Sequence, residues 1–168
     1  MDEIVNRVAN SSLITIDLED WFPKEITTTL DISDWLFQGL ILKEKDFRES
    51  VKQHNWSQYK DQVLFLICAT DAIIPSWAYM LITLSASSFT SKVYRCSYDT
   101  YIQLHYQNVM DSINVDEFKN KPVIIKGCSK KPVPETAYLS LIQKLAPFVK
   151  SILFGEACSS VPLYKQSK

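Results

Sequence analysis

Four short apolar runs, separated by longer segments of helical periodicity, constrain the fold of residues 61–168 most strongly. The runs at 63–67 and 122–125 are almost entirely apolar, as strands covered on both faces must be. The other two runs, at 92–95 and 149–154, are more mixed. The segments between the runs place apolar side chains three or four residues apart, which is the spacing of an amphipathic helix. The sequence therefore predicts the order β-α-β-α-β-α-β.

Three apolar stripes define the predicted helices. Pro75 and Pro134 stand near the expected helix starts, and Pro147 follows the third helix where it should end. Strands joined through helices favour a parallel sheet with right-handed crossovers. We therefore expect residues 61–164 to form a three-layer α/β core around one mostly parallel sheet. The stripes are Ile74, Trp77, Ala78 and Leu81; Ile102, Tyr106, Val109 and Ile113; and Tyr138, Leu141, Ile142 and Leu145.

Residues 1–60 differ from the rest in charge and pattern. They carry 11 acidic and 7 basic side chains, whereas residues 61–168 carry 8 acidic and 11 basic ones. Residues 13–18 and 26–30 are strand-like, and residues 43–52 form a charged helix that turns Phe47 and Val51 inward. We expect a small β-rich and helical appendage over 1–60, packed on the core, and a frayed tail at 165–168. No internal repeat is apparent.

Composition excludes several classes of protein. The 18 Lys and Arg against 19 Asp and Glu leave no basic excess for a nucleic acid or an anionic membrane as partner. No apolar run approaches the roughly 18 residues of a membrane span, and the first ten residues do not resemble a signal peptide. A cytoplasmic location is expected. With three glycines and no glycine-rich motif, no nucleotide cofactor is expected. His54 and His105 form no ligand pair, and the sequence assigns no reaction.

The cysteines follow the predicted strands. Each of the four stands at or just after the carboxyl end of one strand, the edge where open α/β sheets bind ligands. In the common strand order 2-1-3-4, the strands before Cys68, Cys128 and Cys158 are neighbours, about 4.8 Å apart, and Cys96 lies on the edge strand. Three thiolates suit zinc or iron. Asp71 either adds an oxygen ligand or caps the helix near Pro75.

Other interpretations of the same residues stay open. Cysteine is a common buried residue, and no compact CxxC spacing is present. Cys128 stands near three lysines, which favour its thiolate, so a sulfur carrier or thiol oxidoreductase with Cys158 as resolving cysteine is an alternative. A third hypothesis is a non-catalytic interaction module that docks through residues 31–52 and their tryptophans, with a homodimer as one outcome. The three lysines are Lys126, Lys130 and Lys131.

The chain resembles an uncharacterised bacterial family, found mostly in Bacteroidetes and catalogued as domain of unknown function 2480. The resemblance covers nearly the whole chain, departs from the family pattern around residues 85–100, and carries no established chemistry. The pattern includes Cys68, Asp71, Cys128 and Cys158 but not Cys96. Members are encoded near genes of the sulfur-mobilisation system, which implies an accessory role with iron–sulfur cluster assembly proteins. The resemblance rests on DWLFQGLILKEKDFR (34–48), CATDAIIPSWAYM (68–80), IKGC (125–128) and FGEACSSVP (154–162).

Overall fold

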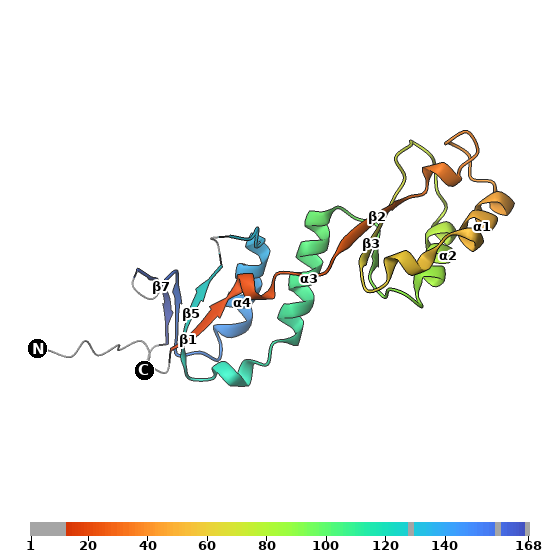
Figure 1. The fold of residues 1–168 in the computed structure, drawn as a ribbon. Coiled ribbons are helices and arrows are strands. Elements are labelled where there is room, and N and C mark those ends of the chain that lie inside the picture. The colour runs from red at the N-terminus through yellow and green to blue at the C-terminus, as the bar shows by residue number, and fades with distance from the viewer. Residues whose placement is uncertain (1–12, 128–129, 157–158, 167–168) are drawn as a thin grey trace, which may run out of the picture. The chain divides into compact units, whose positions relative to one another are not determined.

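The structure is a computed structural model that describes residues 13–127, 130–156 and 159–166 (Figure 1). Within these residues, four α-helices and seven strands form a mixed α/β fold with two mostly parallel sheets, which confirms the predicted α/β class. The chain divides into two compact units. Unit 1 comprises Met1–Pro23 and Asp99–Lys168, and unit 2 comprises Lys24–Tyr98.

Unit 2 contains a parallel three-stranded sheet in the order β2-β3-β4. Its core packs Leu64 and Leu66 of β3 against Phe47 of α1 and Ile82 of α2. The predicted helix at 43–52 and its inward Phe47 and Val51 are confirmed. The elements are β2 (Thr27–Asp31), η2 (Ser33–Trp35), α1 (Glu44–Gln53), η3 (Trp56–Tyr59), β3 (Val63–Ile67), α2 (Ser76–Ala86) and β4 (Val93–Tyr94).

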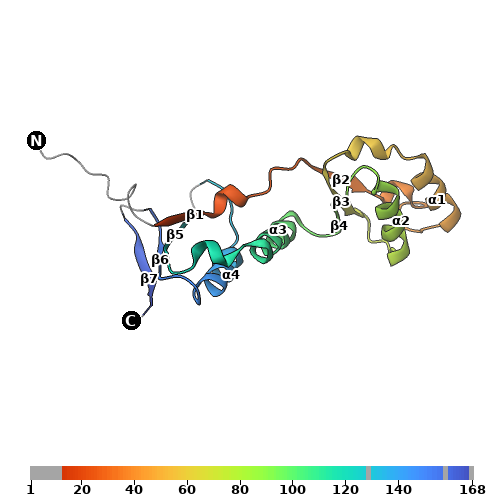
Figure 2. The same ribbon diagram turned by 90° about the horizontal axis from the view of Figure 1, so that it is seen from below.

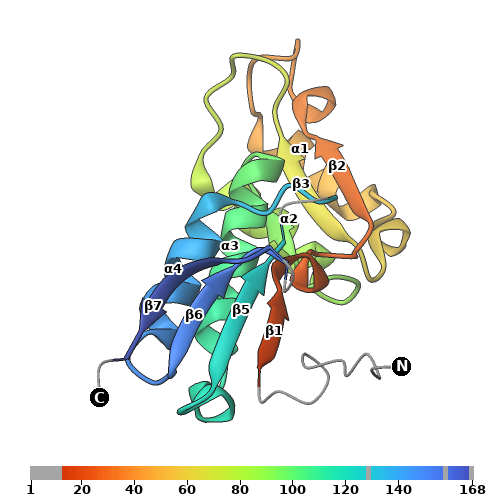
Figure 3. The same ribbon diagram turned by 90° about the vertical axis from the view of Figure 1, so that its left-hand side faces the viewer.

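Unit 1 contains a four-stranded sheet in the order β1-β5-β6-β7, in which only β7 is antiparallel. Helices α3 and α4 lie on the same face of this sheet (Figures 2 and 3). Both helices bury long side chains there, among them Tyr106 and Leu141. The elements are β1 (Ile14–Asp17), η1 (Leu18–Trp21), α3 (Tyr98–Ser112), η4 (Val115–Phe118), β5 (Pro122–Lys126), α4 (Glu135–Leu145), β6 (Ser151–Phe154) and β7 (Val161–Lys165).

The single sheet predicted for residues 61–164 is wrong. The predicted neighbours β3 and β4 do pair, and so do β5 and β6, but β3 does not pair with β5. Instead β2 pairs with β3 and β1 pairs with β5, so the N-terminal strands complete two separate sheets. In each sheet the parallel strands lie side by side in the order in which they occur along the chain. The described strands therefore contain no point at which the strand order reverses, which is where open α/β sheets have their topological switch point.

Three further details differ from the sequence prediction. Successive right-handed crossovers in one direction place α3 and α4 on one face of their sheet, rather than on the two faces of a three-layer core. The expected boundary between residues 60 and 61 falls inside unit 2. Strand β7 was not predicted, and it includes Lys165, which the prediction assigned to a frayed tail.

The two units repeat one succession of elements: strand, 3-10 turn, helix, 3-10 turn, strand, helix, strand. In each unit the first strand ends in the motif Asp-x-x-Asp-Trp, at residues 17–21 and 31–35. The later elements keep one spacing, because η3 and η4 begin at 56 and 115, β3 and β5 at 63 and 122, and α2 and α4 at 76 and 135, each pair 59 apart (122 minus 63).

Buried side chains obey the same spacing of 59 residues. The prediction that the chain has no internal repeat is therefore wrong. Because unit 2 is inserted after the first strand and turn of unit 1, the first strands of the two units, which begin at residues 14 and 27, do not share this spacing. Equivalent buried pairs are Phe47 and Tyr106, Val51 and Met110, Ala78 and Ala137, Ile82 and Leu141, and Ala86 and Leu145.

Gly127 should be the glycine least tolerant of substitution. Its φ is +138°, and an added Cβ would lie 2.8 Å from Leu18 Cβ and 3.1 Å from the Leu18 backbone nitrogen. We expect Gly127→Ala to lower the free energy of unfolding by about 3 kcal/mol, from strain and a backbone clash together. Gly39→Ala is the control, because its φ is +71° but the nearest atom is 3.7 Å away, so about 1 kcal/mol is expected. Urea titration followed by circular dichroism measures both, and equal losses would contradict the clash.

Candidate functional site

The carboxyl edge of the unit 1 sheet is joined by ion pairs centred on one lysine. Lys126 ends β5, and its Nζ lies 3.3 Å from Oδ2 of Asp17, which ends β1. The same Nζ lies 3.7 Å from Oε1 of Glu156, which follows β6. The hydrogen bond with Asp17, and then the charge of Glu156, raise the pKa of Lys126 above its usual value. Three neighbouring strand ends are thereby linked.

The turn after β5 is held from two sides. Glu19 is nearly buried, and its Oε1 accepts the backbone N–H of Lys130 at 2.8 Å. On the other side, the Tyr138 hydroxyl donates to the carbonyl of Gly127 at 2.5 Å. The Tyr106 hydroxyl donates to the Leu18 carbonyl at 2.7 Å, and burial raises the pKa of Tyr106. Gly127 is therefore tied to α4, and the backbone of Lys130 is tied to η1.

A pocket of about 490 Å³ opens beside α4 in unit 1. Its walls come from α4, from the ends of β5 and β6, and from β7. The rings of Tyr138 and Phe154 meet edge to face at 5.9 Å within this lining. Among the lining residues Glu135 alone carries a charge. The lining residues are Ile125, Val133, Glu135, Tyr138, Leu139, Ile142, Phe154 and Leu163.

The equivalent position in unit 2 has different chemistry. Tyr79 stands 59 residues before Tyr138, and Arg95 stands 59 residues before Phe154. The Arg95 guanidinium carbon lies 4.5 Å from the centre of the Tyr79 ring, where unit 1 has an aromatic pair. Leu163 comes from β7, and unit 2 ends its sheet at β4 without such a strand. The pairing of Tyr138 with Phe154 and the wall from β7 are therefore particular to unit 1.

The predicted metal site is divided by the two sheets. Cys68 and Asp71 belong to unit 2, whereas Cys128 and Cys158 lie outside the described residues. Because β3 does not share a sheet with β5 and β6, the strand-order argument that places Cys68 beside the other two is wrong. The neighbouring strands β5 and β6, which precede Cys128 and Cys158, are as predicted. Over residues 13–127, 130–156 and 159–166, no group of three or more His, Cys, Asp or Glu side chains is arranged to hold a metal ion.

Cys68 and Asp71 have local roles in unit 2. Cys68 is a partly buried free thiol, and its Sγ lies 3.5 Å from both the carbonyl and the hydroxyl oxygen of Thr70. Asp71 does not cap α2, because the capping residue is Pro75. It lines a separate pocket of about 600 Å³ with Leu40 and Trp77. One of the two strands beside β3 is β4, which precedes Cys96, the cysteine that the sequence set aside.

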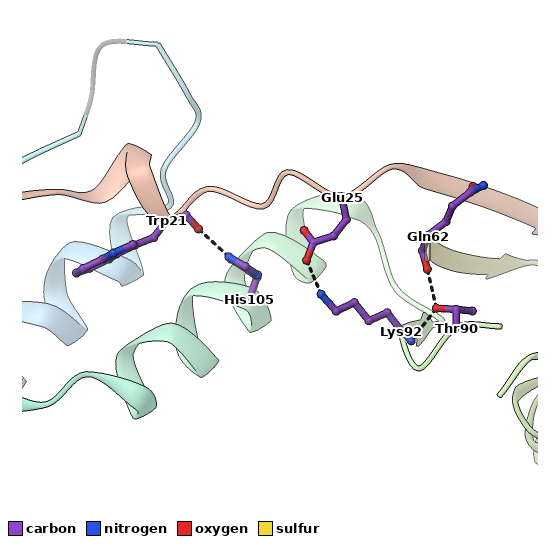
Figure 4. Close-up of polar contacts among 6 residues, drawn as sticks. All are labelled: Trp21, Glu25, Gln62, Thr90, Lys92 and His105. Carbon is purple, nitrogen blue, oxygen red and sulfur yellow. Dashed lines mark hydrogen bonds and ion pairs between the residues drawn. The ribbon is translucent and has the colours of Figure 1, made fainter. Parts of the chain in front are cut away.

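The histidines and the predicted docking tryptophans are structural. In unit 1, His105 Nε2 lies 2.7 Å from the Trp21 carbonyl oxygen (Figure 4). In unit 2, burial lowers the pKa of His54, which stacks on Tyr59.

Trp35 and Trp56 meet edge to face in this aromatic cluster, so they pack the core of unit 2. The exposed apolar side chains of the segment are Phe37, Leu40 and Ile41, which the sequence did not single out.

Polar contacts also join the starts of the strands in unit 2. The Lys92 ammonium pairs with the Glu25 carboxylate, and the Thr90 hydroxyl donates to the Gln62 carbonyl at 2.6 Å (Figure 4). The backbone N–H of Lys92 donates in turn to the Thr90 hydroxyl oxygen at 3.0 Å. These contacts link the amino-terminal ends of the strands, at the edge of the sheet opposite Cys68 and Asp71. The Thr90 hydroxyl can be buried because it both donates and accepts a hydrogen bond.

Asp31 gives unit 2 a pH-dependent stability. Its Oδ1 accepts the backbone N–H groups of Ser33 at 2.9 Å and Ala69 at 3.1 Å. The bond from Ser33 is the main cause that lowers the pKa of Asp31, against an opposing effect of burial. The depressed pKa means that this stabilisation is complete above the unfolded-state pKa of about 3.9 and is lost as pH falls through the lower folded-state value.

We therefore expect Asp31→Asn to cost about 1 kcal/mol of unfolding free energy at pH 7 and progressively less as pH falls below about 3.9. Urea titrations across this pH range measure the difference. Asp34→Asn, which changes an exposed carboxylate three residues away, is the matched control and should change little at any pH. A cost for Asp31→Asn that does not vary with pH would contradict the assignment.

No helix among the described residues is long and apolar enough to cross a membrane. One family model, described as "Protein of unknown function (DUF2480)", matches residues 2–166. Neither the curated proteins nor the solved structures contain a significant match. The pocket and the carboxyl edge therefore have to be interpreted from their own chemistry.

Proposed function

The chain belongs to DUF2480, a family of proteins of unknown function, and we propose that unit 1 binds a small, mainly apolar molecule in the pocket beside α4. One observation carries the proposal. A pocket of about 490 Å³ has the size of small-molecule sites, and its lining combines apolar side chains with a few polar groups, as such sites do.

The place of the pocket in the fold supports the proposal. Ile125 and Phe154 lie at the carboxyl ends of the parallel strands β5 and β6, the edge where open α/β sheets bind ligands. In unit 1 the pocket lies at this edge although the strand order of the sheet does not reverse there. Strand β7, which unit 2 lacks, adds Leu163 as a further wall.

The walls are held in place before any ligand binds. Helix α4 is anchored by its buried Ala137, Leu141 and Leu145. The hydrogen bond from Tyr138 to the Gly127 carbonyl fixes the tyrosine ring against the end of β5. A site with ordered walls loses little conformational entropy on binding, so apolar contact is converted efficiently into affinity.

We expect the neutral dye N-phenyl-1-naphthylamine to bind in this pocket and to fluoresce more strongly there. Ile142→Trp should fill the pocket and weaken dye binding about tenfold or more, because Ile142 is a partly buried lining residue. Thr83→Trp is the matched control, since Thr83 holds the same place in α2 of unit 2 and is exposed. Fluorescence titration measures the dissociation constants.

Two results of this titration would overturn the proposed function. One is a wild-type protein that does not enhance the fluorescence of the dye. The other is equal binding by the wild type and by Ile142→Trp, with circular dichroism showing that the variant is folded.

A second candidate function, thiol or metal chemistry, is favoured by the pairing of β5 with β6. The backbone N–H of Gly155, just after β6, donates to the carbonyl of Ile125 in β5 at 2.9 Å. Gly127 follows the last residue of β5. The segments that carry Cys128 and Cys158 therefore leave adjacent strands. We propose for this pair the binding of zinc or iron; a sulfur carrier or thiol oxidoreductase is the alternative use of the same thiols. An accessory role in iron–sulfur cluster assembly rests on the family resemblance alone.

The sheet topology makes a specific prediction for this second function. After anaerobic purification, the double variant Cys128→Ser with Cys158→Ser should lose bound zinc or iron, whereas Cys68→Ser should keep it, because β3 belongs to the other sheet. Elemental analysis by mass spectrometry measures the metal content. Negligible metal in the wild type, or loss caused by Cys68→Ser alone, would contradict it.

A further inference from the structure

We propose that the ligand of the unit 1 pocket is an amphiphilic amine, whose cationic group binds the Glu135 carboxylate while its apolar body fills the pocket. The inference rests on the proposed small-molecule function and names the class of ligand. It depends on the charge of the lining, on the partners of the nearby lysines and on a comparison of the two units.

Glu135 supplies the charge of the pocket. The other seven lining residues are apolar or aromatic, and the one further polar group among their side chains, the Tyr138 hydroxyl, already donates to Gly127. Glu135 stands in the first turn of α4, where a negatively charged side chain interacts favourably with the helix dipole. The first turn of a helix alone would attract an anion, but here the protein's own carboxylate stands there.

Three lysines of this region, Lys126, Lys131 and Lys144, have other partners. Lys126 follows Ile125 on the strand, so its side chain leaves the opposite face of the sheet, where it binds Asp17 and Glu156. None of the ion pairs found among the described residues includes Glu135. A cation from a ligand would therefore meet a carboxylate that no described cation neutralises. The other two engaged lysines are Lys131, whose Nζ donates to the Glu19 carbonyl, and Lys144, whose Nζ donates to the Met110 and Asp111 carbonyls.

The comparison with unit 2 indicates that this carboxylate is not required by the framework. The residue 59 positions before Glu135 is Ser76, which begins α2 just as Glu135 begins α4. At the other wall, Arg95 of unit 2 takes the place of Phe154. The two copies share their buried positions, but unit 1 has a carboxylate where unit 2 has a neutral serine, and unit 2 has a cation where unit 1 has a neutral ring. Of these two equivalent places, only the one in unit 1 suits a cationic ligand.

The test compares three eight-carbon probes that differ only in their head group: octylamine, octanol and octanoate. Each is titrated against the complex of the full-length protein with N-phenyl-1-naphthylamine at pH 7, where an alkylamine is protonated like lysine. Because Glu135 is exposed, we expect octylamine to displace the dye about twofold to fivefold better than octanol, and octanoate to be the weakest. The advantage of the amine should shrink in high salt.

Glu135→Gln should remove the advantage of octylamine over octanol. Glu117→Gln, which removes one exposed carboxylate from η4 of the same unit, is the control for net charge and should preserve the advantage. Equal displacement by the three probes, stronger displacement by octanoate, or an amine advantage that survives Glu135→Gln would overturn the amine proposal while the pocket function stands. Failure of the dye itself to bind would overturn the proposed function.

Discussion

The pairing of two N-terminal strands with two different partners organises the whole molecule. β1 joins β5, and β2 joins β3, although β1 and β2 are separated only by η1 and a short connection. A strand that pairs along one edge of a sheet satisfies the backbone groups of that edge and so closes it to other strands. Because β1 and β2 occupy those edges of β5 and β3, the chain has two small sheets in place of one large one. Unit 1 then gains its pocket from α4 and from β7 on the far side of β6.

Local structure was readable from the sequence to a greater extent than strand pairing. The strands at 13–18 and 26–30, the helix carrying Phe47 and the helices after Pro75 and Pro134 all form. The error lay between β3 and β5. Both strands are apolar on both faces, so both must be buried, but an apolar run does not show which strand it pairs with. The exposed β7, which contains Pro162, lacks the alternating apolar pattern that would have revealed it.

The site was predictable only in part, for a related reason. The carboxyl ends of β5 and β6 are adjacent, as predicted for the strands before Cys128 and Cys158. Cys68 was grouped with them because β3 was predicted to lie in the same sheet, and it does not. The pocket residues share no motif; they meet because α4 crosses the sheet beside β7. One signal was available, since the Asp-x-x-Asp-Trp motif occurs at both 17–21 and 31–35 and marks two equivalent strand ends.

The interleaved arrangement also sets an order in which the chain can fold as it is synthesised. In β2, Thr27 pairs with Val63, so unit 2 has all its strands once residue 94 has been made. In β1, Ile14 pairs with Val123, a partner that the ribosome adds much later. Contacts between distant residues form slowly because a long loop must close first. Throughout the synthesis of unit 2, β1 therefore remains without its partner β5, so its unpaired backbone groups are exposed until the chain reaches residue 126.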